Sequence, residues 1–188
     1  LAYINGSFAD ERGHLDRLER SLFELKIPMP MSRIALQYVM REMARRNRMK
    51  DAALYIQVTR GVAPRDFKFP QNVRPSLIMT MRPADFDMNA RKKTLRKAAS
   101  VPDLRWKRRD IKSTALLAQV LSKQAAVERG AYEALMVDDD GFVTEGASTN
   151  AWIVDRKGHL ITRPPRGNMI LKGVTLNALQ ALCQKNGV

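Results

Sequence analysis

The sequence predicts a mixed α/β (α+β) protein built as two lobes. Three observations lead to this prediction: apolar residues with helical spacing near the N-terminus, short runs of strand-forming residues along the chain, and an aperiodic stretch near its middle. We expect a small N-terminal α/β lobe at residues 1–82, a linker at 83–91 and a strand-rich lobe at 92–188. The chain, 188 residues long, is large enough for two such small lobes.

Two helices open the first lobe. Apolar residues at 15, 18, 22 and 25 recur with helical spacing, and the Pro-rich segment 27–32 ends that helix. Ser32 is a suitable N-cap for a second helix, which we expect to run to about Met49. The residues expected to face inward in this second helix are apolar: Ile34, Leu36, Val39, Met40 and Met43. The residues expected to face outward are arginines: Arg41, Arg45 and Arg46. Strands at 53–59 and 76–81 follow, with a loop at 61–70 between them.

The second lobe alternates strands with helices. A strand is expected at 95–101, then a helix at 113–130 that ends at Gly130. The apolar residues on one side of that helix are Leu116, Leu117, Val120, Leu121 and Ala125. Strands at 132–137 and 142–145 flank an Asp-rich turn at 138–141. A hairpin formed by 150–155 and 159–162 and a final helix at 175–185 complete the lobe.

Composition excludes several classes of protein. No apolar run approaches the roughly 20 residues that span a bilayer, and the first residues show no signal-peptide pattern, so we expect no membrane partner. The single cysteine, Cys183, cannot form an internal disulfide and is typical of a reducing compartment, which favours a cytoplasmic location. Two histidines and one cysteine cannot build a standard zinc site, so no metal is expected.

The net charge of +14 has two possible explanations. Ten Lys and Arg residues lie between Arg91 and Lys112, which would suit a basic protein that binds nucleic acid. However, no nucleic-acid-binding motif accompanies this cluster, and an aromatic content of 6% offers few stacking platforms. A solvated basic surface that attracts small anions, including a phosphate-bearing cofactor, is the explanation we favour.

Two short segments carry the residues on which the functional prediction depends. Lys112 lies in Arg109-Asp110-Ile111-Lys112-Ser113, and Glu145 lies about thirty residues later in Val143-Thr144-Glu145-Gly146-Ala147-Ser148-Thr149-Asn150. A lysine that forms a Schiff base and a carboxylate that holds a pyridinium nitrogen are the groups that pyridoxal phosphate chemistry requires. Each residue also has an ordinary structural explanation, since Lys112 could lie on the surface at a helix start and Glu145 could face solvent from a strand.

Six motifs together resemble a known family. They are His14-Leu15-Asp16-Arg17-Leu18, Val58-Thr59-Arg60-Gly61, Asp110-Ile111-Lys112-Ser113, Tyr132-Glu133-Ala134, Val143-Thr144-Glu145-Gly146 and Ile170-Leu171-Lys172-Gly173-Val174-Thr175. In order and spacing they resemble the fold-type IV (class IV) pyridoxal-phosphate-dependent aminotransferases, most of all the bacterial D-amino-acid (D-alanine) aminotransferases. The likeness extends over essentially all 188 residues and implies that the chain is an internal piece of a longer protein.

The resemblance implies a role for each of several residues. Lys112 would bind the cofactor as a Schiff base and act catalytically, and Glu145 would face the pyridine nitrogen. Leu171 would pack against the ring, although a place in an ordinary core would also explain it. The residues implied for the phosphate are Arg17, Gly173, Val174 and Thr175, and those implied for further cofactor contacts are Ser148 and Thr149. A surface pair with Asp16 or Glu19 is the alternative explanation for Arg17.

The residues implied for the substrate depart from the family pattern at one position. In the bacterial D-amino-acid enzymes, the loop after the Val-Thr-Arg-Gly strand carries an arginine and a histidine that bind the substrate carboxylate across a homodimer. Arg65 matches the arginine, whereas Phe67 occupies the histidine position. The resemblance implies a transaminase that moves the amino group of a D-amino acid to 2-oxoglutarate or pyruvate. An aminodeoxychorismate lyase and a branched-chain aminotransferase remain open as alternatives within the family.

Overall fold

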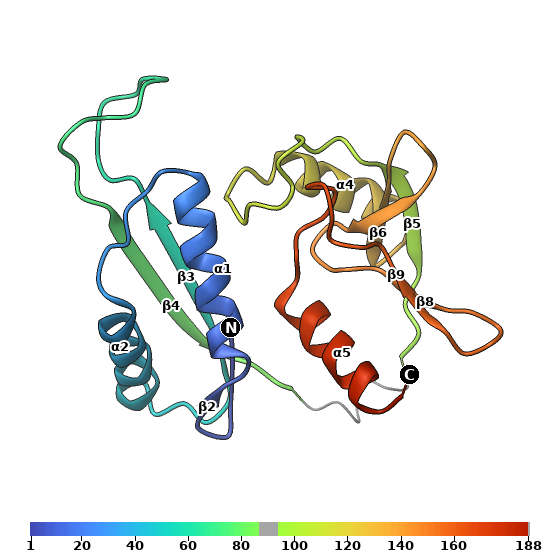
Figure 1. The fold of residues 1–188 in the computed structure, drawn as a ribbon, viewed down its shortest axis with the longest axis horizontal. Coiled ribbons are helices and arrows are strands. Elements are labelled where there is room, and N and C mark those ends of the chain that lie inside the picture. The colour runs from blue at the N-terminus through green and yellow to red at the C-terminus, as the bar shows by residue number, and fades with distance from the viewer. Residues whose placement is uncertain (87–93, 188) are drawn as a thin grey trace. The chain divides into compact units, whose positions relative to one another are not determined.

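The computed structural model describes residues 1–86 and 94–187. The chain divides into two compact units, Leu1–Asn89 and Ala90–Val188 (Figure 1). Most of the expected linker at 83–91 and the basic residues Arg91, Lys92 and Lys93 fall outside the described residues. The mixture of helices and strands confirms the predicted α+β class.

Unit 1 is a four-stranded antiparallel sheet with two helices. The strands lie in the order β2 (Ser7–Phe8), β1 (Ala2–Ile4), β3 (Ala52–Thr59) and β4 (Ser76–Pro83). Strands β3 and β4 pair along their whole length, from Ala52 opposite Pro83 to Thr59 opposite Ser76. The helices are α1 (Glu11–Glu24) and α2 (Arg33–Arg46). The core joins helices to sheet and contains Leu15, Leu36, Met40 and Leu54.

The N-terminal hairpin of unit 1 was not among the expected elements. Strands β1 and β2 have only three and two residues, too few for an alternating pattern to stand out. The signal that could have revealed them is Asn5-Gly6, since both residues have positive φ (47° and 84°), as a tight two-residue hairpin turn requires.

Helix α2 begins where its sequence predicts and buries most of the expected face, with Ile34 as the exception. The Ser32 side chain accepts a hydrogen bond from Ala35 N at 3.3 Å, which confirms the expected N-cap. Leu36 and Met40 are fully buried, whereas Ile34 is 80% exposed, so its expected inward position is wrong. Residues two positions apart in a helix differ by about 200° around its axis, so Ile34 and Leu36 must occupy opposite faces of the helix. The helix ends at Arg46, three residues before the expected Met49.

Unit 2 is built around a three-stranded sheet. Its order is β5 (Ala98–Pro102), β6 (Glu133–Val137) and β7 (Val143–Gly146), with β5 and β6 parallel and β7 antiparallel to β6. The turn at 138–141 joins β6 to β7 as expected, and its Gly141 has a φ of +82°. A separate hairpin pairs β8 (Trp152–Val154) with β9 (Leu160–Thr162).

Two helices complete unit 2: α4 (Leu117–Glu128) and α5 (Val174–Lys185). Helix α4 lies in the connection between the parallel strands β5 and β6 and packs against both (Figure 1). It is shorter than the expected helix at 113–130, because residues 113–116 are irregular and the backbone leaves the helix before Gly130, whose φ is +68°. Its buried residues are Ser122 and Ala126, so small side chains face the sheet. The leucines on the other side are exposed.

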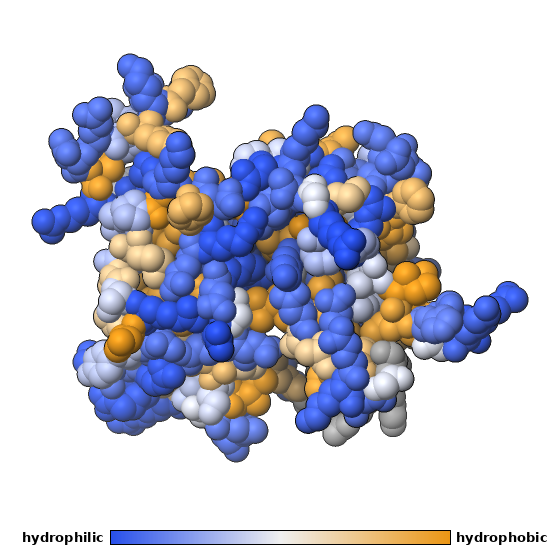
Figure 2. All heavy atoms as spheres, viewed as in Figure 1, coloured by the Kyte–Doolittle hydropathy of each residue, from blue (hydrophilic) through white to orange (hydrophobic). Residues whose placement is uncertain are grey.

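Polar side chains predominate on the face of the molecule drawn in Figure 2, as expected from 33 Lys and Arg residues. None of the described helices is long and apolar enough to cross a membrane.

Candidate active site

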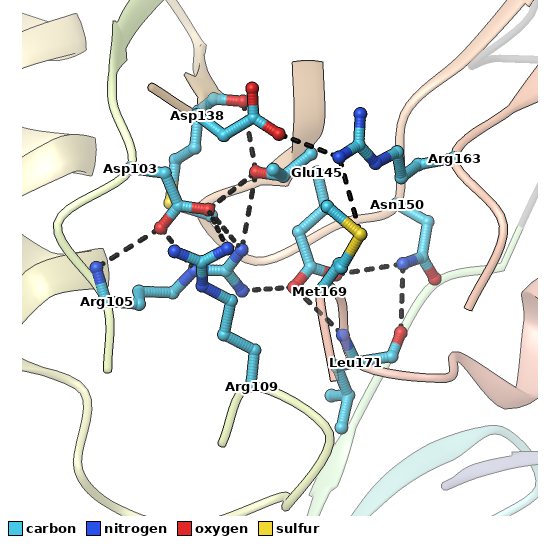
Figure 3. Close-up of polar contacts among 11 residues, drawn as sticks. Asp103, Arg105, Arg109, Asp138, Glu145, Asn150, Arg163, Met169 and Leu171 are labelled. Carbon is cyan, nitrogen blue, oxygen red and sulfur yellow. Dashed lines mark hydrogen bonds and ion pairs between the residues drawn. The ribbon is translucent and has the colours of Figure 1, made fainter. Parts of the chain in front are cut away.

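A buried arginine bridges two buried carboxylates at the end of strand β5. Asp103 directly follows Pro102, the last residue of the strand, and its side chain is fully buried. Arg105 reaches back to it with two contacts, Nε to Oδ1 at 2.9 Å and Nη2 to Oδ2 at 2.7 Å. The remaining Nη1 of Arg105 forms an ion pair with Oε1 of Glu145 in β7 (Figure 3). The Thr144 hydroxyl also donates to Asp103 at 2.7 Å.

Glu145 is held on both of its carboxylate oxygens. Oε1 accepts from Arg105 and from the backbone N–H of Leu171 at 3.1 Å. Oε2 accepts from the Asn150 side-chain amide at 3.0 Å (Figure 3). Only 6% of the Glu145 side chain is exposed. The sequence-based alternative of a solvent-facing glutamate is therefore wrong for this structure.

The two carboxylates of this network have opposite pKa shifts. Burial raises the pKa of Asp103, but hydrogen bonds from Arg105 and Thr144 outweigh burial and hold this pKa below its ordinary value. For Glu145, burial is the dominant effect and raises the pKa, although Arg105 and the Leu171 N–H favour the ionised form. Two further differences act in the same direction. Arg105 makes a bidentate contact with Asp103 but offers only one nitrogen to Glu145, and the Asp103 charge also raises the pKa of Glu145.

The segment that follows Ile170 connects this network to the start of helix α5. Asn150 donates a second hydrogen bond to the Leu171 carbonyl at 3.2 Å. Gly173 occupies the N-cap position of α5, and no side chain among the described residues caps this helix. The first N–H groups of α5 are therefore available to an anion, in the place where the resemblance puts the phosphate. Val174 is buried, and the Thr175 side chain is exposed at the same helix start.

A second ion pair fixes the approach to this segment. Arg163 Nη2 lies 2.8 Å from Asp138 Oδ2, in the turn between β6 and β7, and 3.4 Å from Met169 Sδ (Figure 3). Both charged side chains are mostly buried, at 15% and 10% exposed. The pair anchors the chain just before Leu171 to the same hairpin that carries Glu145.

Lys112 lies in the irregular segment that joins β5 to α4. It is exposed, and α4 begins only at Leu117, so Lys112 is not at a helix start as expected. The two residues before it are anchored: Ile111 is buried, and the buried Asp110 forms two hydrogen bonds with Arg108, at 3.0 and 3.1 Å. Lys112 is therefore an exposed residue that directly follows an anchored stretch of backbone.

Ser148 and Thr149 both point to another carboxylate. Each hydroxyl donates to Oε2 of Glu133 at 3.2 Å, and Lys123 pairs with the other oxygen of Glu133 at 3.1 Å. Both hydroxyl residues are exposed. Their expected contact with the cofactor stays a prediction, and in this structure they hold the loop after β7 against the start of β6.

Three arginines of the basic cluster at 91–112 lie close to carboxylates. Arg105 is mostly buried, and Arg108 pairs with Asp110. Arg109 Nη1 lies 3.7 Å from the same Asp103 that binds Arg105. Carboxylates thus compensate these three charges, which argues against a solvent-exposed surface for nucleic acid in this part of unit 2.

The remaining predicted residues lie in unit 1. Arg17 is half-buried in α1, and burial lowers the pKa of its guanidinium. Its two acidic neighbours, Asp16 and Glu19, both bind Arg33 of α2, at 2.6 and 3.3 Å. The grouping of Arg17 with the unit 2 residues stays a prediction.

The loop between β3 and β4 carries the predicted substrate residues. Arg65 and Phe67 are both exposed, Phe67 at 97%, and the guanidinium lies 6.0 Å from the ring centroid. At the base of the loop Gly61 has a φ of +119°, and a Cβ there would lie 2.3 Å from the Arg74 carbonyl oxygen, so the loop requires glycine at this point.

Sequence reasoning missed the supporting residues of Glu145. Asp103 and Arg105 are about forty positions away in the chain, and no local pattern connects them to Glu145. Asn150 could have been noticed, because it lies in the same short motif and carries an amide that suits a carboxylate.

The family model of the class IV aminotransferases matches residues 1–188. The chain is 35% identical over 188 residues to the D-alanine aminotransferase of Bacillus licheniformis and spans 65% of that protein. Two solved structures have the same fold, each with a TM-score of 0.86. One is a branched-chain aminotransferase of Thermoproteus uzoniensis (26% identity, 100% of this chain and 64% of that one). The other is a Legionella pneumophila protein assigned as a 4-amino-4-deoxychorismate lyase (22% identity, 99% and 68%).

The chain thus spans a little less than two thirds of the curated relatives that it matches. The family match nevertheless covers all of its residues, and the motifs that carry the resemblance lie in the matched range. This chain belongs to the class IV aminotransferases, a family that depends on pyridoxal phosphate.

Proposed function

We propose that this chain forms most of a transaminase that uses pyridoxal phosphate to move the amino group of a D-amino acid to a 2-oxo acid such as 2-oxoglutarate or pyruvate. The observation that carries the proposal is the buried Glu145 carboxylate, which is hydrogen-bonded to the segment that leads into the uncapped start of α5. The likeness to D-alanine aminotransferases supports the choice of D-amino acids.

The donor set around Glu145 fits the pyridine end of the cofactor. A carboxylate offers about four lone-pair positions, and three are used by Arg105, Leu171 and Asn150. Oε2 accepts from Asn150 alone among the described residues, so it can take one more donor. Burial raises the pKa of Glu145, so a further positive partner beside Arg105 would favour its ionised form. A protonated ring nitrogen would supply both the donor and the positive charge.

The phosphate end is assigned to the start of α5 and to Arg17. Backbone N–H groups at Gly173, Val174 and Thr175, with the Thr175 hydroxyl, would donate to phosphate oxygens. Arg17 would add a planar pair of charged donors. Leu171, between Glu145 and the helix start, would pack against the ring.

Lys112 is the residue to which we assign the catalysis. Its Nζ would bind the cofactor covalently and, once released by substrate, would move the proton of the substrate α-carbon. Bound pyridoxal phosphate supplies the electron sink that stabilises negative charge at that carbon. Glu145 would keep the ring nitrogen protonated, which the electron sink requires.

Arg65 and Phe67 are the proposed substrate residues, acting in a cytoplasmic homodimer. The guanidinium would bind the substrate carboxylate, and the phenyl ring would provide an apolar wall where the family has a hydrogen-bond donor. An apolar wall also suits a branched-chain amino acid, which is the second candidate substrate class. The fold shared with a lyase adds aminodeoxychorismate as a third compound to assay.

The test is a spectrum of the full-length protein with pyridoxal phosphate, with and without borohydride. We expect a visible-edge band that borohydride traps on Lys112, and activity with D-alanine and 2-oxoglutarate. Lys112→Ala should lose the trapped adduct and at least about 10³-fold in rate, in the range that proton transfer and covalent catalysis contribute. Lys157→Ala, in the exposed turn between β8 and β9, is the matched control and should keep both.

The outcomes separate the candidates. Activity with L-leucine but not with D-alanine would replace the D-amino-acid assignment by the branched-chain one. Release of pyruvate from aminodeoxychorismate, with no transamination, would favour the lyase. A folded full-length protein that shows no band and no trapped lysine would contradict the proposal as a whole.

A further inference from the structure

Asn150 connects the two ends of the candidate cofactor site through a closed set of hydrogen bonds. Its amide nitrogen donates to Glu145 Oε2 at 3.0 Å and to the Leu171 carbonyl at 3.2 Å. The Leu171 N–H returns a bond to Glu145 Oε1 at 3.1 Å. A primary amide has two N–H donors, and both are used here. The carboxylate in β7 and the segment before α5 are thus joined directly through the Leu171 N–H and a second time through the Asn150 side chain (Figure 3).

The oxygen of the same Asn150 amide lies close to the backbone of Gly173. A Cβ built on Gly173 would lie 2.0 Å from Asn150 Oδ1. The backbone of Gly173 has a φ of −64° and a ψ of 137°, which any residue can adopt. The glycine is therefore required for space and not for its backbone conformation. The missing side chain at residue 173 leaves room for the Asn150 amide, and the two hydrogen bonds to Glu145 and Leu171 orient its nitrogen.

We propose that Asn150 is a positioning residue that sets the spacing between the Glu145 carboxylate and the phosphate-binding start of α5. Pyridoxal phosphate is a rigid ring whose nitrogen and phosphate lie a fixed distance apart, so both contacts form together only if the protein holds that distance beforehand. Preorganisation of this kind increases affinity because little ordering is left for the binding step. The inference rests on the proposed function.

The experiment compares Asn150→Ala and Asn150→Asp with wild type in the full-length protein. Asp has nearly the same shape as Asn but no N–H donors, and its charge would lie beside Glu145. Both variants should bind pyridoxal phosphate about 10- to 100-fold more weakly, the effect expected when a hydrogen bond to a charged group is lost. Asn47→Ala is the matched control, because Asn47 also donates its amide to a carbonyl, at the exposed end of α2.

Two further readouts separate positioning from general destabilisation. Without cofactor, hydrogen exchange at the Leu171 amide should become faster in both Asn150 variants and stay unchanged in Asn47→Ala. With cofactor, the pH at which the visible band titrates should shift, because the ring nitrogen loses its fixed partner. Gly173→Ala should shift that titration too by displacing the Asn150 amide, and it provides a second route if an Asn150 variant does not fold.

The results distinguish this inference from the proposed function. If wild type binds pyridoxal phosphate and the Asn150 variants match it in affinity, titration and exchange, the positioning role is wrong and the proposed function stands. An Asn150→Asp protein that behaves as wild type while Asn150→Ala does not would show that only side-chain volume matters, which also overturns the inference. If wild type itself binds no pyridoxal phosphate, the proposed function is wrong and the positioning role falls with it.

Discussion

Unit 1 and unit 2 both contain clusters of arginines and carboxylates, but they place them in different surroundings. In unit 1, Glu42 accepts from Arg45 and Arg46 on the outer face of α2, where the arginine side chains are 69% and 75% exposed. In unit 2, Arg105 binds Asp103 with side-chain exposures of 5% and 0%. Similar residues thus form a solvated surface in one unit and a buried network in the other.

The difference in burial indicates which of the two clusters belongs to a functional site. Exposed pairs contribute little because water and salt screen them and because their long side chains lose entropy. Burying charges costs desolvation free energy, so each buried group needs partners with good geometry. The buried network of unit 2 includes Glu145, the residue that the motif analysis assigned to the cofactor. A network that costs stability and ends at such a residue is more readily explained by positioning than by stability alone.

Among the substitutions in these two clusters, we expect a change at Arg105 to reduce stability the most. Arg105→Ala removes the main partner of Asp103 and the ion pair of Glu145, leaving two buried carboxylates. We expect the free energy of unfolding of the full-length protein to fall by about 3–5 kcal/mol, the usual cost of removing one partner from a buried ion pair. Urea denaturation followed by circular dichroism measures it. Arg45→Ala, the same change on the surface of α2, is the control and should have almost no effect.

If Arg105→Ala were as stable as Arg45→Ala, the buried ion pairs of unit 2 would not differ in energy from the exposed pairs of unit 1. This result would mean that Asp103 and Glu145 become protonated or hydrated at no cost, and that the network does not hold the site.

The next effect concerns pH and depends on the lowered pKa of Asp103. Its folded-state pKa lies below the ordinary value, so its contribution to stability is fully present above about pH 4 and is lost as the pH falls through the folded value. Asp103→Asn cannot ionise, so we expect it to cost about 1–3 kcal/mol at neutral pH and to flatten the stability profile below pH 4. Thermal melts between pH 2 and pH 7 would show both effects.

The salt dependence of this profile is the decisive comparison. Because Asp103 is buried, its contribution should persist at about 1 M salt, where surface interactions are screened. If the difference between wild type and Asp103→Asn disappeared in salt, the network would be behaving like a surface pair.

The sequence predicted local structure better than it predicted burial. The helix starting after Ser32 was predicted from its cap, and the strands predicted at 53–59 and 76–81 lie within the observed β3 and β4; caps and strand-forming runs are local signals. The exposed position of Ile34 and the small residues under α4 depend on which face meets the sheet. Apolar content alone does not determine that face, because Ser122 and Ala126 allow α4 to approach the sheet closely.

The sequence also indicates the residues of the candidate site that stand in short motifs, but not the partners that are distant in the chain. Lys112, Glu145 and Gly173 each stand in a short motif, so the sequence alone was enough to propose them as site residues. The partners of Glu145 lie up to forty residues away, and their grouping arises from the pairing of β5, β6 and β7. Long-range hydrogen bonds of this kind leave no periodic signal, which is why Asp103, Arg105 and the role of Asn150 required the structure.

The smallest effect is expected for the exposed ion pairs of Glu42 in unit 1. Arg45 and Arg46 lower the pKa of Glu42 to about 2, mainly through hydrogen bonds at 2.8 and 3.2 Å. A lowered pKa means that any stabilisation is present above the ordinary glutamate value of about 4.3 and is lost as the pH falls toward 2. Glu42→Gln should therefore change the melting temperature slightly at pH 6 and still less at pH 2, where Glu42 is partly protonated. The difference at pH 6 should vanish at about 1 M salt, because both arginines lie in solvent. A Glu42→Gln effect as large and as salt-resistant as that of Asp103→Asn would show that burial does not distinguish the two units, and that the network around Glu145 needs another explanation.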